Sequence, residues 1–114
     1  MKELEKNTYV FSVEAIGFAK TLEKKEAQKK NAGIIKEYAG TVYRKLADAQ
    51  QEDETEVFAD SLRKSYQAAS QAKDLFEELE IENDVDLQDQ QKKLLEKIKI
   101  IVSKMDEIIK KLIY

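Results

Sequence analysis

The most regular hydrophobic pattern in the chain lies in its C-terminal part, residues 87–114. Apolar positions recur there at alternating steps of four and three residues, which form one continuous stripe on an α-helix. The stripe comprises Leu87, Leu94, Ile98, Ile101, Met105, Ile108 and Leu112, with the polar Gln91 as an interruption. A helix with such a stripe is unstable alone in water, so the pattern predicts partner helices that cover it.

Three amphipathic segments before this stripe supply the expected partners. Their apolar positions also recur at helical spacing, and they predict helices over residues 8–27, 32–50 and 55–80, followed by a fourth over 86–113. The expected core positions are Phe11, Ala15, Phe18, Leu22, Ile35, Ala39, Val42, Leu46, Leu62, Ala69, Ala72 and Phe76. Short links force consecutive helices to run antiparallel. We therefore expect one all-α domain over residues 1–114, an antiparallel up-down-up-down four-helix bundle.

Local signals refine the ends and contacts of these helices. The expected N-caps are Asn7 or Thr8, Asp53 or Thr55, and Asp84 or Asp86. Residues 1–6 are expected to fray. Gly17 and Gly40 cost stability in a helix interior, and we interpret them as points where a neighbouring helix approaches closely.

Composition supports long helices and argues against catalysis. The 114 residues contain no proline, three glycines and 38% charged residues. Without cysteine or histidine, the chain has no thiolate nucleophile, and it has neither of the commonest zinc ligands. The acidic run 82–86 fails as a calcium loop, because Leu87 and Lys93 stand where glycine and glutamate are needed. No phosphate-binding or dinucleotide-binding motif is present. We expect no enzyme activity, no metal, no cofactor and no small-molecule substrate.

Charge is distributed unevenly along the chain. Residues 1–49 carry ten basic and seven acidic side chains, residues 50–89 carry three and thirteen, and residues 90–114 carry seven and three. The most pronounced basic features are a line on the last helix and a group expected to meet across the second and third helices, near Tyr43 and Tyr66. These candidate nucleic-acid-binding residues are Lys93, Lys97, Lys104, Lys111, Arg44, Lys45, Arg63 and Lys64.

Two observations limit the nucleic-acid interpretation. The sequence pI of about 5.2 is far below the value typical of nucleic-acid-binding domains. The same lysines also fit the solvated faces of amphipathic helices.

No apolar run is long enough to span a bilayer, and the N-terminal part lacks a cleavage signal, so we expect a cytoplasmic protein without membrane contact.

The pattern of the whole chain resembles a small bacterial family known as four helix bundle proteins. The family includes the 23S rRNA intervening-sequence proteins and, more distantly, the accessory variability proteins of diversity-generating retroelements. The similar stretches are residues 11–16, 18–22, 38–42, 46–49, 58–62 and 75–79. The resemblance implies a non-catalytic homo-oligomer that assembles as a ring, with the pentamer as the expected form. In the retroelement branch it also implies binding to RNA or DNA and to a reverse transcriptase.

The sequence therefore leaves two functions open. The first is an oligomeric four-helix bundle that binds nucleic acid or assists a reverse transcriptase. The alternative is a protein-binding scaffold or adaptor without a nucleic-acid role, which is favoured by the strongly acidic segment 50–89.

Overall fold

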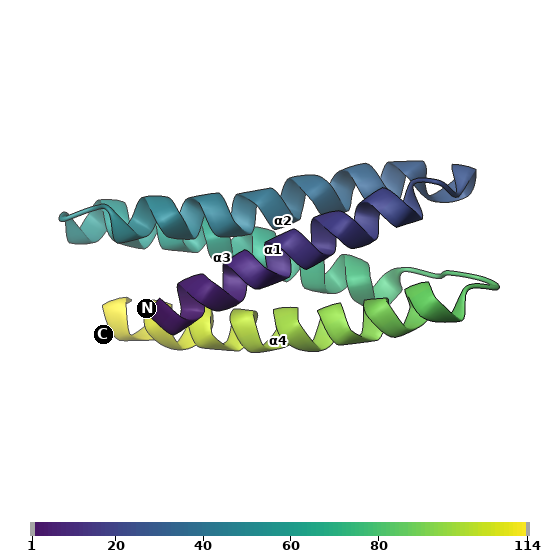
Figure 1. Cartoon of the computed structure of the whole chain (residues 1–114). Coiled ribbons are helices and arrows are strands. Elements are labelled where there is room, and N and C mark those ends of the chain that lie inside the picture. Colours follow the sequence, from purple (N-terminus) through teal and green to yellow (C-terminus); the bar gives the residue numbers. More distant parts are fainter. Residues whose placement is uncertain (1, 114) are drawn as a thin grey trace.

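The computed structural model describes residues 2–113, and this part of the chain folds into four long helices. They are α1 (Lys2–Leu22), α2 (Lys29–Gln50), α3 (Thr55–Glu78) and α4 (Val85–Ile113), with a short 3-10 helix η1 (Glu26–Gln28) before α2. Consecutive helices run antiparallel, and α4 returns to pack against both α3 and α1 (Figure 1). The predicted all-α four-helix bundle is confirmed.

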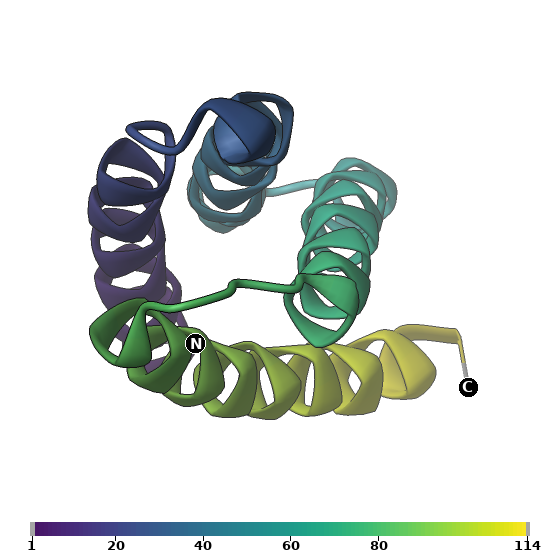
Figure 2. The same ribbon diagram turned by 90° about the vertical axis from the view of Figure 1, so that its right-hand side faces the viewer.

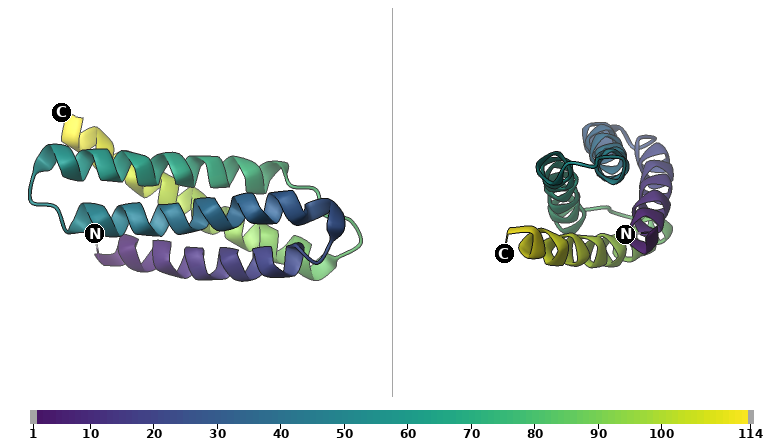
Figure 3. Two further views of the ribbon diagram at one scale, coloured as in Figure 1. Left: turned by 90° about the horizontal axis from the view of Figure 1, so that it is seen from above. Right: turned by 90° about the vertical axis from the view of Figure 1, so that its left-hand side faces the viewer.

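The fourth helix lies obliquely to the other three. The helices α1, α2 and α3 form an arch, and α4 crosses its open side (Figure 2). Seen from above, α4 runs diagonally across the direction of α2 and α3 (Figure 3). The molecule is elongated, with extents of 48 × 20 × 19 Å. Because α4 is oblique, α1 and α4 meet less closely than the other adjacent helices.

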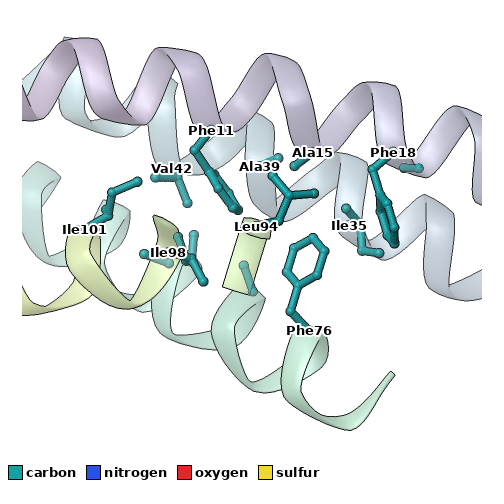
Figure 4. Packing of buried hydrophobic residues seen from close by; sticks show 14 of the residues in the cluster. Phe11, Ala15, Phe18, Ile35, Ala39, Val42, Phe76, Leu94, Ile98 and Ile101 are labelled. Carbon is teal, nitrogen blue, oxygen red and sulfur yellow. The ribbon is translucent and has the colours of Figure 1, made fainter. Parts of the chain in front are cut away.

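The core is built from the predicted stripes, and three phenylalanines occupy its centre. Phe11 and Phe18 of α1 contact Phe76 of α3, with ring centroids 6.1 Å and 5.6 Å apart. Ile98 and Ile101 of α4 lie in the same cluster (Figure 4). The rings point inward from opposite sides of the bundle, so the cluster joins the N-terminal helix to the second half of the chain.

Small residues in the middle of α3 allow close packing against α2. Ala68, Ala69 and Ala72 are buried, and the buried Ser65 hydroxyl donates a hydrogen bond of 2.6 Å to the carbonyl oxygen of Val42 on α2. The hydroxyl thus satisfies its own donor inside the core while it holds the two helices in register.

The helix boundaries near the N-terminus differ from the prediction. Helix α1 begins at Lys2 rather than near residue 8, because Leu4 and Thr8 are both buried and extend its core-facing stripe. The Thr8 hydroxyl donates to the Glu5 carbonyl oxygen at 2.8 Å, a bond within the helix rather than a cap. The helix ends at Leu22, its last buried residue, five residues earlier than predicted. Helix α2 then begins at Lys29, three residues early.

The caps of the last two helices show one correct and one wrong prediction. Asp84 caps α4, since its carboxylate accepts a hydrogen bond of 3.1 Å from the backbone N–H of Leu87. Neither Asp53 nor Thr55 caps α3. Glu54 holds the N-cap position with extended backbone and no side-chain hydrogen bond, and Thr55 is the first helical residue.

Gln91, the polar interruption in the α4 stripe, closes the C-terminal end of α3. Its amide nitrogen donates to the carbonyl oxygens of Phe76 and Leu79, both at 2.7 Å. The last carbonyls of a helix lack partners within the helix, so a buried end needs such a donor. The amide nitrogen of Gln88 donates in the same way to the carbonyl oxygen of Ile81. Gln91 is thus a capping residue supplied from the next helix.

The glycines do not mark close helix approach, which corrects the prediction. A methyl group placed on Gly17 or Gly40 would meet no atom within 4 Å outside its own helical turn. Gly17 lies on an exposed line of α1 with Val10 and Val13, whereas the face that carries Phe11 and Ala15 is buried.

Replacing Gly17 with alanine is expected to stabilise the protein. Alanine favours the helical backbone by about 1 kcal/mol over glycine in a helix interior, and open space at this position removes any steric cost. The midpoint of urea-induced unfolding, followed by circular dichroism, measures the effect. A lower midpoint in Gly17→Ala would contradict the open environment at this position.

Candidate interaction surfaces

The structure separates the predicted basic residues into two groups. Lys93, Lys97 and Lys104 line the space between α1 and α4, which we call the α1–α4 seam. Lys45 and Lys64 line a hollow of about 270 Å³ between α2 and α3. Each helix packs against its two neighbours in the order α1, α2, α3, α4, so these two surfaces lie on opposite sides of the bundle. The structure therefore does not bring the two groups into one groove.

The hollow between α2 and α3 is only weakly basic. The Lys45 amine lies 3.7 Å from the Asp48 carboxylate, and the Lys64 amine lies 3.1 Å from the Asp60 carboxylate. Arg44 donates to the hydroxyl of Thr41 at 3.3 Å and, like Arg63, is exposed. The lysine charges are thus largely compensated by acids on their own helices, and the exposed pairs add little stability.

The two tyrosines expected beside this hollow lie elsewhere. Tyr43 packs edge-to-face against Tyr9 of α1, with ring centroids 5.4 Å apart. Tyr66 lies near Lys110 of α4 and contributes slightly to a raised pKa of that amine, for which a hydrogen bond to Asp106 is the main cause. Tyr38 lines the hollow instead. Tyr38, Tyr43 and Tyr66 are partly buried, and Tyr38 and Tyr66 pack against the core. Which neighbouring helix each one meets depends on tertiary packing.

Three hollows follow one another along the α1–α4 seam. The middle hollow, about 170 Å³, is bordered by Asn7, Val10, Lys97, Ile100 and Ile101. A hollow of about 280 Å³ lies toward the C-terminal end of α1, beside Glu14, Gly17, Phe18, Gln90, Lys93 and Leu94. A third, about 180 Å³, lies toward its N-terminal end, beside Glu3, Leu4, Asn7, Lys104, Glu107 and Ile108. The loose packing of α1 on α4 thus leaves an interrupted groove.

Exposed apolar side chains lie at the middle of this seam and beside it, where Val13 follows Val10 by three residues on α1. Val10 and Val13 of α1 are 38% and 53% exposed, and Ile100 of α4 is 54% exposed. Val10 and Ile100 face each other across the middle hollow. Sequence reasoning placed Ile100 outside the core but did not identify this patch. The available signal was the second apolar line on α1, which the core does not use.

Charged groups occupy the two ends of the seam. Lys97 forms an ion pair with Glu14 across it. Among residues 2–113, no ion pair involves Lys93 or Lys104. Lys104 shares its hollow with Glu3 and Glu107, so that end carries a net negative charge. Because Glu14 is engaged by Lys97, Lys93 leaves the other end net positive.

The acidic and basic parts of the chain meet at one end of the bundle. The Lys25 amine of the α1–α2 link lies 3.6 Å from the Asp84 carboxylate, and the Gln28 amide nitrogen donates to the Glu80 carbonyl oxygen at 2.8 Å. Part of the charge asymmetry seen in the sequence is therefore compensated within the molecule, which reduces the basic surface available to an external polyanion.

The described residues show neither a cluster of metal-binding side chains nor a helix that could span a membrane. No group of three or more histidine, cysteine, aspartate or glutamate side chains in residues 2–113 is arranged to hold a metal ion. None of the helices in that range is long and apolar enough to cross a membrane.

Comparison with known proteins found no matching family model, curated protein or solved structure. The family resemblance therefore stays a prediction from the sequence pattern.

Proposed function

We propose that this chain is a non-catalytic helical interaction module that binds a protein partner along the α1–α4 seam. The observation that carries the proposal is the row of hollows with exposed Val10 and Ile100 at its middle and opposite charges at its ends. An apolar centre with a charged rim is the usual arrangement of a protein interface. This function corresponds to the scaffold alternative of the sequence analysis.

A photo-crosslinking amino acid at Val13 tests this function in cells that make the protein. We expect protein adducts from position 13 and none of the same adducts from a matched probe at Gln67, which is exposed beside the opposite α2–α3 hollow. Identical adducts from both positions, or nucleic acid alone at position 13, would contradict a protein-binding seam.

Nucleic-acid binding is the second candidate, and the unpaired lysines of α4 favour it. Lys93 and Lys104, with Lys111 further along the same line, are exposed and form no ion pair within the described part of the chain. Fluorescence anisotropy of a labelled structured RNA, measured at low and at moderate salt, tests this function. Phosphate contacts predict binding that weakens steeply with salt and weakens further in Lys93→Gln. Absence of binding at low salt would exclude it.

A further inference from the structure

We propose that the α1–α4 seam receives a single amphipathic helix of a partner protein, with an apolar side chain about every seventh residue, an acidic end and a basic end. This inference rests on the proposed function, because it specifies the partner of the same surface. Three features of the molecule support it: the spacing of the hollows, the distribution of charge along the seam and the apolar side chains that another copy of this chain exposes.

The hollows repeat at intervals of seven residues on both helices. On α1 they are bordered by Glu3, Val10 and Gly17, and on α4 by Lys93, Ile100 and Glu107. Seven residues of helix correspond to about 10 Å. A helix laid along the seam presents residues of one face at this same repeat, so its side chains can enter successive hollows as they do in a coiled coil.

Each hollow has room for a side chain. The volumes of about 170, 280 and 180 Å³ match or exceed an engineered protein cavity of about 150 Å³ that accepts benzene. The middle hollow lies between Val10 and Ile100, so it suits an apolar side chain. At Gly17 the space beside the helix is open, and the absent side chain lets a partner backbone come close.

The charges at the two ends give the partner helix a direction. Beside Lys93 the one lining carboxylate, Glu14, is already paired with Lys97, so the two lysines outnumber it, which favours an acidic residue on the partner. At the opposite end Glu3 and Glu107 outnumber Lys104, which favours a basic residue. Reversing the partner would place like charges together at both ends, and like charges held close oppose binding.

A second copy of this chain does not supply such a helix. The apolar stripes of the four helices pack in the core, where Ile108 and Leu112 at the end of the α4 stripe are partly buried. The large apolar side chains exposed among residues 2–112 are Tyr9, Val10, Val13, Val57, Val85 and Ile100. None of them forms a further seven-residue repeat on a single helix. Leu95, Val102 and Ile109 do recur every seven residues on α4, but they are partly buried against the core. These observations favour an occupant from another protein.

A designed peptide tests the proposal directly. The probe is a fluorescein-labelled helical peptide of about 20 residues, rich in alanine and glutamine, with leucine at every seventh position, glutamates at one end and lysines at the other. The control peptide has the same composition with its leucines moved off that repeat. We expect anisotropy titrations to show at least about tenfold weaker binding of the control peptide, since binding depends on filling successive hollows.

Protein variants connect binding to the seam. Ile100→Asp should weaken binding of the designed peptide about tenfold or more, because it places a charge beside the middle hollow. Val85→Asp, at an exposed position away from the seam, should leave that binding unchanged. Both positions are exposed, so both variants should fold, and circular dichroism checks this. Lys93→Glu should weaken binding of the designed peptide and strengthen binding of a second peptide in which the glutamates and lysines at the two ends are exchanged.

Several outcomes would overturn the proposal. Equal binding of both peptides would show that the seven-residue repeat is irrelevant, and unchanged binding in Ile100→Asp would place the peptide elsewhere. Self-association by analytical ultracentrifugation that Ile100→Asp abolishes, without peptide binding, would assign the seam to a second copy. Protein adducts at Val13 without peptide selectivity would leave the proposed function standing while this inference fails.

Discussion

Phe76→Ala is expected to cause the largest loss of stability, about 3–5 kcal/mol in the free energy of unfolding. Phe76 is completely buried, and its ring contacts both Phe11 and Phe18. Truncation removes the ring and two favourable aromatic contacts, and it leaves a cavity at the junction of α1 and α3. The two helices cannot close that cavity fully, because Ser65 and its alanine neighbours already hold α3 tightly against α2.

Urea unfolding followed by circular dichroism measures this loss by linear extrapolation. Tyr9→Ala is a suitable aromatic control, because Tyr9 is 54% exposed and, within residues 2–113, its ring contacts only that of Tyr43. We expect the control to lose only about 1 kcal/mol. Equal losses in the two variants would contradict the central position of Phe76 in the core.

The predictable part of this structure follows from helical periodicity. The stripe on α4, the inward line of Phe11 and Ala15, and the placement of Asp84 before the last helix each depend on residues close in sequence. Such local signals determine which face of a helix avoids water. For this reason the fold class and most of the core could be predicted, while the helix ends near residues 2 and 22 depended on burial of Leu4 and Leu22 by distant segments.

The candidate surface could not be predicted in the same way. The hollows exist because α4 crosses obliquely and meets α1 loosely, and no local pattern specifies a crossing angle. The lysines of α4 were identifiable, but not their neighbours Glu14 and Glu3, which come from the opposite end of the sequence. Likewise, the sequence shows Gln91 only as a polar interruption of the apolar stripe, because its two carbonyl acceptors at the end of α3 are known only from the fold.

The adjacent residues Ile100 and Ile101 of α4 are expected to differ strongly in the stability that each loses on replacement by alanine. Ile101 is 1% exposed and Ile100 is 54% exposed, so one side chain lies in the core and the other borders the seam. Ile101→Ala should lower the free energy of unfolding by about 2–5 kcal/mol, through lost burial and a residual cavity. Ile100→Ala should change it by less than about 0.5 kcal/mol, as exposed substitutions usually do.

The pair is informative because the two substitutions are chemically identical and occupy successive positions of the same helix. Helix propensity therefore cancels in the comparison, since both replace isoleucine with alanine inside α4. Parallel urea titrations of the two variants give the difference in stability. Equal losses of unfolding free energy would contradict the assignment of Ile101 to the core-facing side of α4 and of Ile100 to its exposed side, or would show that Ile100 is already covered in the free protein. A large loss at Ile101 alone leaves Ile100 available at the seam, where its contribution should appear in binding rather than in folding.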